Sequence, residues 1–142
     1  MITYETETTI DASPDTVWKH LIAFDRHDEW SQHFKLRGAP DVGSRGRVEF
    51  ELFGRPAGAP VVIQKADPGR ELRWNGGPRR IVFGSHYFIM EPLDGGSRTR
   101  FRHGESFSGL LAPLVWGLLK AQLGPSYNGF NEDLKRRAER DA

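Results

Sequence analysis

A long hairpin in the second half of this chain restricts its possible folds more than any other feature. Two alternating runs, residues 81–90 and 98–107, flank the turn-forming residues Asp94-Gly95-Gly96. Asp and Gly tolerate the positive φ angles that a tight turn needs. Successive residues of a strand point to opposite faces, so each run has an inner and an outer face. We therefore expect a β-hairpin whose second strand leads directly into a C-terminal helix.

The inner face of the second strand carries two ionisable side chains. Thr99, Phe101, His103, Glu105 and Phe107 share one face, which its aromatic residues mark as the inner one. Burying a histidine and a carboxylate costs free energy unless they find partners. His103 and Glu105 are therefore the strongest candidates for a functional role.

Length and composition exclude several classes of protein. A chain of 142 residues fits one domain that can bury a real core. The absence of cysteine excludes disulfides, thiol nucleophiles and cysteine-ligated metals. No apolar run approaches the length of a membrane span, and the N-terminus lacks the basic and apolar regions of a signal peptide. We expect a single domain over residues 1–142, located in the cytoplasm, without stable membrane insertion.

The rest of the chain predicts an antiparallel sheet covered by one long helix. Residues 2–10 alternate as a half-buried strand does, and Ser13-Pro14 is a helix-start signal. We expect a second short helix at 26–30, further strands at 33–38, 46–53, 61–66 and 71–74, turns at 54–59 and 75–77, and a long helix at about 110–138. The helix shows an apolar stripe of Leu111, Leu114, Val115, Leu118, Gln122, Phe130 and Leu134, and we expect Gly124-Pro125 to kink it without ending it. Hairpin-linked strands form an antiparallel sheet, and only the long helix is large enough to cover it, so the fold class is α+β.

Several segments resemble those of a known superfamily. They are residues 10–18 (IDASPDTVW), Trp30, residues 67–74 (DPGRELRW), 86–93 (HYFIMEPL), 99–109 and 129–134 (GFNEDL). On these patterns the chain resembles the START-like or helix-grip superfamily, also called SRPBCC, and most of all its bacterial polyketide cyclase/dehydrase group. The resemblance implies a curved seven-stranded antiparallel sheet wrapped around a long C-terminal helix, with two short helices after the first strand. It also implies a cavity between sheet and helix for a small hydrophobic molecule, whereas fold alone does not specify chemistry.

The resemblance also explains the outer face of the hairpin. Arg98, Arg100 and Arg102 alone suggest a surface for an anion or a nucleic acid. In this superfamily the first strand pairs with the last, which would place Glu5 and Glu7 opposite the arginines. We therefore expect charge pairs and no nucleic-acid partner, in keeping with 20 basic and 19 acidic residues overall.

Hydrophobicity leaves the inner face of residues 81–90 open, because both faces of this strand carry apolar side chains. The family pattern favours the face with His86, which would then lie with His103 and Glu105. A two-residue turn would pair His86 with His103, whereas a four-residue loop would pair it with Glu105. Either way the three side chains cluster, because diagonal neighbours in a sheet lie only ~7–8 Å apart. This cluster is the predicted polar centre of the cavity.

Two main interpretations of the cluster stay open. The side chains satisfy one another and orient the polar end of a ligand, or they act as an acid–base pair in an enzyme of the cyclase or dehydratase type. In the second case His103 is the general base and Glu105 its orienter, with His86 beside them. A zinc site is a weaker alternative because no helical HExxH spacing supports it, so we expect no metal and no cofactor.

The predicted function is binding of a small apolar or aromatic molecule by a carrier or sensor, as a monomer or homodimer. An interaction module would need an exposed apolar patch, and the sequence shows no obvious one. Aromatic side chains can stack on a flat ligand, and we expect Trp30 near the cavity mouth. The predicted ligand-binding residues are Trp30, Val48, Phe50, Leu72, Trp74, Phe88, Met90, Phe101, Leu118 and Gln122.

Overall fold

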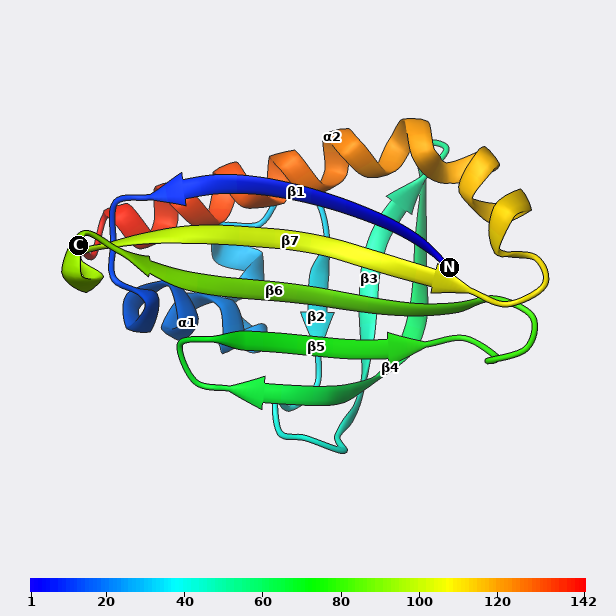
Figure 1. Ribbon diagram of the computed structural model, residues 1–142, viewed down its shortest axis with the longest axis horizontal. Helices are drawn as coiled ribbons and strands as arrows, with labels where there is room; N and C mark the ends of the chain where they lie inside the picture. The colour runs from blue at the N-terminus through cyan, green and yellow to red at the C-terminus, as the bar shows by residue number, and fades with distance from the viewer.

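The structure, a computed structural model that describes all 142 residues, is a curved antiparallel sheet around one long helix (Figure 1). The strands lie in the order β1-β7-β6-β5-β4-β3-β2, and every neighbouring pair is antiparallel. In chain order the elements are β1 (Ile2–Ile10), α1 (Pro14–Ile22), η1 (Phe24–Glu29), β2 (Lys35–Arg37), β3 (Arg45–Leu52), β4 (Arg55–Asp67), β5 (Glu71–Gly76), β6 (Phe83–Leu93), η2 (Asp94–Gly96), β7 (Arg98–Ser108) and α2 (Ala112–Glu139). This arrangement confirms the expected α+β helix-grip fold.

The β6–β7 hairpin takes the longer of the two loops considered. Leu93 pairs with Arg98, so four residues connect the strands, and Asp94, Gly95 and Gly96 all have positive φ. In this register His86 lies opposite Glu105, and Phe88 lies opposite His103. The loop therefore decides which ionisable residues are direct neighbours across the sheet.

The first strand pairs with the last, as the resemblance implied. On the outer face Arg100 donates to Glu7 over 2.8 Å, and Arg102 donates to Glu5 over 2.9 Å. Arg100 and Arg102 are therefore matched by carboxylates of β1, in agreement with the predicted charge pairs, whereas Arg98 pairs with Asp11 and Asp94.

The β3–β4 connection corrects the prediction of turns at residues 54–59. Only Phe53 and Gly54 form the turn, with φ angles of 51° and 78°, as in a two-residue hairpin of the I′ type. Strand β4 already begins at Arg55, although its first half contains Pro56 and Pro60. That half of β4 pairs with β3 alone, because its pairing with β5 begins only at Val62. Its other edge has no neighbouring strand, so a proline that lacks an N–H on that edge costs no hydrogen bond.

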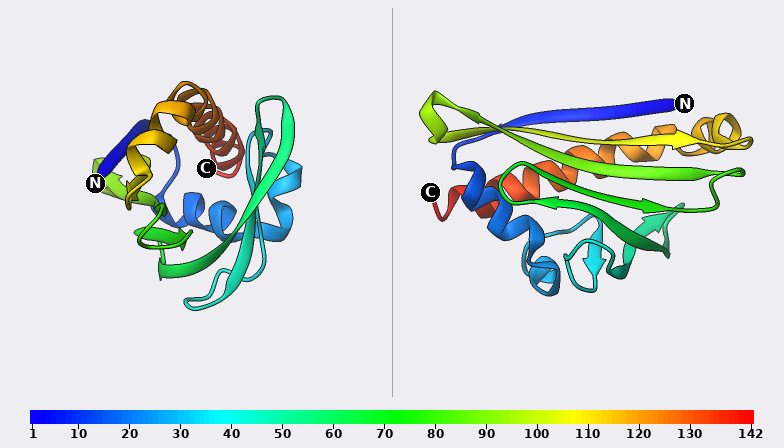
Figure 2. Two further views of the ribbon diagram at one scale, coloured as in Figure 1. Left: turned by 90° about the vertical axis from the view of Figure 1, so that its right-hand side faces the viewer. Right: turned by 60° about the horizontal axis from the view of Figure 1, so that its bottom comes forward.

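The helices follow their sequence signals closely. The Ser13 hydroxyl accepts from the N–H of Thr16 and caps α1, while the second short helix, η1, is a 3₁₀-helix that ends before Trp30. Helix α2 runs on through Pro125, as expected. It lies in the concave side of the curved sheet (Figure 2). No helix is long and apolar enough to cross a membrane.

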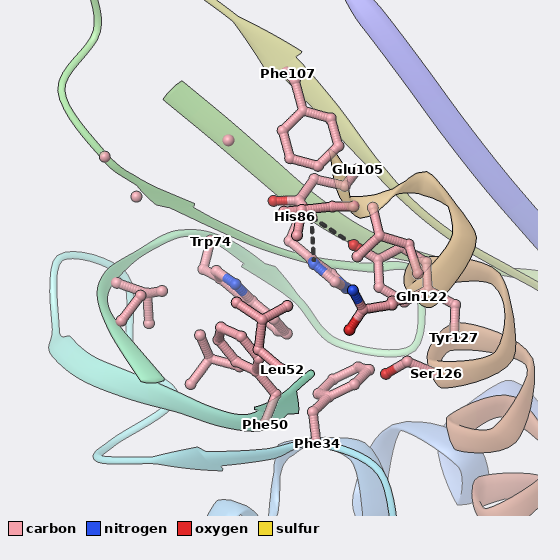
Figure 3. A pocket seen from close by; sticks show the side chains of 18 of the residues that line it. Phe34, Phe50, Leu52, Trp74, His86, Glu105, Phe107, Gln122, Ser126 and Tyr127 are labelled. Atoms are coloured by element: carbon pink, nitrogen blue, oxygen red, sulfur yellow. Dashed lines mark hydrogen bonds and ion pairs between the residues drawn. The ribbon is translucent and has the colours of Figure 1, made fainter. Parts of the chain in front are cut away.

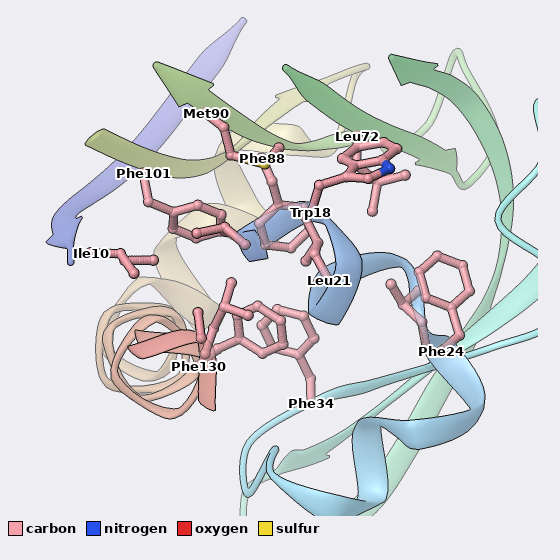
Figure 4. Packing of buried hydrophobic residues seen from close by; sticks show 14 of the residues in the cluster. Ile10, Trp18, Leu21, Phe24, Phe34, Leu72, Phe88, Met90, Phe101 and Phe130 are labelled. Atoms are coloured by element: carbon pink, nitrogen blue, oxygen red, sulfur yellow. The ribbon is translucent and has the colours of Figure 1, made fainter. Parts of the chain in front are cut away.

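One end of this sandwich is filled by a packed core (Figure 4). There α1 and the second half of α2 meet the inner faces of β6 and β7. The fully buried side chains at this end include Leu21, Phe88, Phe101, Phe130 and Leu134. The other end is left partly open, and that space is the candidate site.

Candidate functional site

A cavity of about 280 Å³ lies between the first half of α2 and the inner faces of β3–β7 (Figure 3). Its volume is near the lower limit for small-molecule sites, and its walls are mostly apolar, as such sites usually are. The lining residues are Phe34, Val48, Phe50, Glu51, Leu52, Ala59, Pro60, Val61, Trp74, Gly76, Gly77, Val82, Gly84, His86, Glu105, Phe107, Leu119, Gln122, Leu123, Ser126 and Tyr127.

Some of the residues proposed from the sequence lie on this wall. They are Val48, Phe50, Trp74, His86, Glu105 and Gln122. The ring of Trp74 stacks on the imidazole of His86 with 4.5 Å between centroids and 12° between planes. A flat apolar surface thus directly adjoins the polar end of the cavity.

Four other proposed residues lie on the expected inner face of the sheet, but at the end away from the cavity. Leu72, Phe88, Met90 and Phe101 point inward, yet they belong to the packed core and do not line the cavity. They occupy the start of β5, the end of β6 and the start of β7, where α1 and Phe130 fill the space. Strand alternation determines the face of a residue but does not tell which end of the face is filled.

Two further proposed residues lie away from the cavity. Leu118 is 61 % exposed, because the wall is formed by its neighbour Leu119. Trp30 does not stand at the mouth: its ring packs on His27 and Phe130, with centroids 5.0 and 5.3 Å apart. The segment after Trp30 is drawn toward α2, because the buried carboxylate of Asp133 accepts from the N–H of Gln32.

The helix contributes more of the wall than the sequence analysis proposed. Its cavity face is Leu119, Gln122, Leu123, Ser126 and Tyr127, which follow the i, i+3, i+4, i+7, i+8 spacing of one helical face. This face continues into Phe130 and Leu134, so the signal was present in the sequence. The proposed stripe through Leu114 and Leu118 is instead largely exposed.

The polar end of the cavity is built from three side chains on three elements (Figure 3). Glu105 Oε1 accepts the hydroxyl proton of Tyr127 over 2.5 Å. The same oxygen lies 3.5 Å from Nδ1 of His86. A Cβ at Gly84 would lie 2.5 Å from the other carboxylate oxygen, so only glycine leaves room for Glu105 in this position.

His103 lies behind His86, fully buried and outside the cavity wall. The Nε2 atoms of the two imidazoles are 2.7 Å apart. On its other side, Nδ1 of His103 contacts Oδ1 of Asn131 over 2.7 Å. The amide nitrogen of Asn131 donates to the Thr6 hydroxyl over 2.8 Å. That hydroxyl in turn donates to the backbone carbonyl of His103 over 3.0 Å. His86 therefore faces the cavity directly and His103 does not, and the role of general base for His103 stays a prediction.

The surroundings fix the protonation of two members of this cluster. Burial, and then the charge that His86 can carry, lower the pKa of His103 well below its ordinary value. Burial, and then the negative charge of Glu105, raise the pKa of Tyr127 well above its ordinary value. His103 is thus a neutral imidazole near neutral pH, and Tyr127 keeps the proton that it donates to Glu105.

The arrangement does not form a metal-binding group. No set of three His, Asp or Glu side chains has a geometry that could hold a metal ion. Zinc–nitrogen bonds are about 2.0–2.1 Å long. A zinc ion bound to both His86 and His103 would therefore require their nitrogens to lie much farther apart than the observed 2.7 Å.

Solved structures of bacterial proteins share this fold over nearly the whole chain. Protein TTHA0849 from Thermus thermophilus matches with a TM-score of 0.75 at 15 % identity, covering 99 % of both chains. A START superfamily protein from Mycobacterium smegmatis matches with a TM-score of 0.74 at 15 % identity, also covering 99 % of both. The Zhui aromatase/cyclase from Streptomyces sp. R1128 matches with a TM-score of 0.73 at 16 % identity, covering 98 % of this chain and 94 % of that one.

These identities are low enough that the structural matches establish the fold alone. No curated protein sequence matches the chain. The sequence does match a defined protein family, however, over residues 1–139. The chain therefore belongs to the family described as polyketide cyclase / dehydrase and lipid transport.

Proposed function

We propose that this protein binds a small apolar or aromatic molecule in the cavity between its sheet and α2, as a carrier or sensor. The observation that carries the proposal is the half-open apolar cavity, which ends in a compact polar cluster. Phe34, Phe50, Trp74 and Phe107 supply aromatic wall area, and His86 with Glu105 supplies the polar end. A few placed polar groups in an apolar cavity are the usual composition of a small-molecule site.

The first test is native mass spectrometry of the protein purified from its own source, followed by denaturation to release bound molecules. A stoichiometric apolar adduct is the expected result and would give the chemical class of the ligand. A clean apo mass would argue against tight carriage and direct the work to weak binding and turnover.

A pair of adjacent substitutions tests whether the cavity is the binding site. Leu119→Trp fills the cavity from its helix wall, whereas Leu118→Trp adds the same bulk to an exposed position one residue earlier. We expect Leu119→Trp to reduce binding of the adduct, or of a fluorescent apolar probe, at least tenfold and Leu118→Trp to leave it within twofold. Equal effects of the two variants would place the bound molecule elsewhere.

An enzyme that moves a proton on a bound ketone is the second candidate. One structural neighbour is an aromatase/cyclase. His86 favours this function, because its imidazole is on the cavity wall beside a carboxylate, an arrangement typical of general acid–base groups. On this proposal His86→Phe abolishes turnover of polyketide-like ketones while ligand affinity changes little. Turnover that survives the substitution would exclude His86 as the acid–base group.

A further inference from the structure

A buried chain of hydrogen bonds runs from the cavity wall to the first strand and has a single direction. Thr6, His86, His103 and Asn131 form it, and none of the four side chains is more than 8 % exposed. Buried polar groups need partners, so each proton in the chain has a defined place. Those places can be assigned from the far end inward.

The assignment begins at Thr6, whose hydroxyl has one proton. That proton goes to the backbone carbonyl of His103, so the hydroxyl accepts from Asn131. The amide of Asn131 therefore turns its NH₂ group to Thr6 and its oxygen to His103. An amide oxygen only accepts, so Nδ1 of His103 carries a proton.

The next step passes from His103 to His86. Burial lowers the pKa of His103, so its ring is neutral and holds only the proton on Nδ1. Its Nε2 is a lone pair and accepts from Nε2–H of His86 over 2.7 Å. A His86 ring with a single proton therefore carries it on Nε2, on the buried side, which leaves Nδ1 as an acceptor.

The distance to Glu105 agrees with this assignment. His86 Nδ1 and Glu105 Oε1 are 3.5 Å apart, beyond the 2.7–3.2 Å of an N–H···O hydrogen bond. Two acceptors that face each other keep such a distance. Tyr127 donates its single hydroxyl proton to Glu105 and therefore has none left to donate to His86. The polar end of the cavity thus presents two neighbouring acceptors that lack a shared donor.

We propose that the cavity is specific for ligands with a hydroxyl donor on a flat ring, a phenol or cyclic enol, whose proton is received at His86 Nδ1 and Glu105. Trp74 is the stacking surface beside this acceptor pair, with its ring on the His86 imidazole. Asn131 and Thr6 are positioning residues: they touch no ligand and act by fixing the tautomer of His103 and, through it, that of His86. This inference rests on the proposed function, because it names the ligand class of the same cavity.

Three probes of similar shape test the donor requirement. Binding of 2-naphthol, 2-methoxynaphthalene and naphthalene is measured by isothermal titration calorimetry and by quenching of tryptophan fluorescence. We expect 2-naphthol to bind at least tenfold more tightly than both others, as one hydrogen bond to a charged acceptor provides. Equal affinities would overturn the donor specificity and leave the proposed function standing. If none of the three probes binds, the proposed function fails and this inference fails with it.

Variants then separate the acceptor pair from its support. His86→Phe and Glu105→Gln should each remove most of the preference for 2-naphthol while retaining the affinity for naphthalene. Asn131→Leu, or Thr6→Val if the first variant does not fold, should reduce the same preference. If Asn131 and Thr6 only supported the fold, these variants would lower the affinity for all three probes by the same factor. Leu118→Gln changes an exposed residue of α2 outside the cavity wall and should leave the ratio unchanged.

Nitrogen-15 NMR of the labelled histidines gives a readout that needs no ligand. Near neutral pH we expect His86 to be protonated on Nε2 and unprotonated on Nδ1, and His103 to be protonated on Nδ1. The opposite tautomer of His86, or a doubly protonated ring, would overturn the inference. The Asn131→Leu spectrum should show His86 losing its single tautomer.

Discussion

The two ends of the space between sheet and helix contain side chains of the same kind but differ in what they enclose. At one end, α1 and the second half of α2 pack Leu21, Phe88, Phe101 and Phe130 without exposure. At the other end, the first half of α2 and β3–β4 leave a cavity of about 280 Å³. Hydrophobic composition alone therefore does not separate a core from a binding site. What separates them is whether a further element closes the space.

The segment α1–η1 closes one end of the space between the sheet and α2, and no helix covers the other end in this way. It adds Val17, Leu21 and Phe24 to the core. At the open end the first half of β4 has no β5 partner, and the helix leaves Leu114 and Leu118 each 61 % exposed beside the apolar wall. Exposed leucines are thus present on α2, in a sequence that shows no obvious apolar patch.

The largest expected effect comes from truncating one aromatic residue at each end. Phe130→Ala should lower the free energy of unfolding by about 3–5 kcal/mol, because it leaves a void in a closed core. Phe50→Ala should cost only about 1 kcal/mol, because Phe50 is half-buried on a wall that already faces open space. Urea denaturation of both variants measures the difference. Similar losses would contradict the distinction between core and cavity.

Acid should weaken the closed end through His27. This residue is fully buried: its Nε2 contacts the carbonyl of Leu21 over 2.8 Å, and its Nδ1 accepts from the N–H of Leu36. Burial lowers its pKa to about 4, so between about pH 6.5 and 4 the unfolded chain binds the proton more readily than the folded one. The contribution of His27 to the free energy of unfolding is complete above pH 6.5 and is lost as the pH falls to 4. The expected loss of stability is about 3 kcal/mol.

Unfolding measured across this range tests the contribution of His27. Burial also lowers the pKa of His20 and His103, so those residues add to the same trend. The His27→Gln variant, although less stable at pH 7, should therefore show a smaller loss on acidification than the wild type. The same pH slope in both proteins would show that His27 titrates normally.

The smallest expected effect is on the exposed part of the helix. Leu118→Gln should change the free energy of unfolding by no more than about 0.5 kcal/mol, since the side chain has no buried partner to lose. Leu134→Gln, on the buried part of the same helix, should be severely destabilising because it places an amide in the core. Thermal denaturation compares the pair. A large loss for Leu118→Gln would indicate that the exposed face is covered in solution.

Much of the fold could be predicted because its signals are local. Alternation marked the strands, Ser13-Pro14 marked the start of α1, and the resemblance supplied the pairing of the first strand with the last. The turn prediction at residues 54–59 is wrong because glycine and proline usually signal a loop, whereas a strand with one unpaired edge accepts them. The helix stripe was placed on Leu114 and Leu118 because leucine alone does not tell which apolar face is covered.

Strand alternation was enough to place His103 and Glu105 on one inner face, because it is a property of the backbone, and the family resemblance added His86 to that face. Packing in three dimensions then divided the three, with His86 and Glu105 on the cavity wall and His103 buried behind them. That division depends on Asn131 and Tyr127, which α2 brings from far along the chain to the same strand. A local pattern carries no information on such partners, since their contact exists only after sheet and helix have packed.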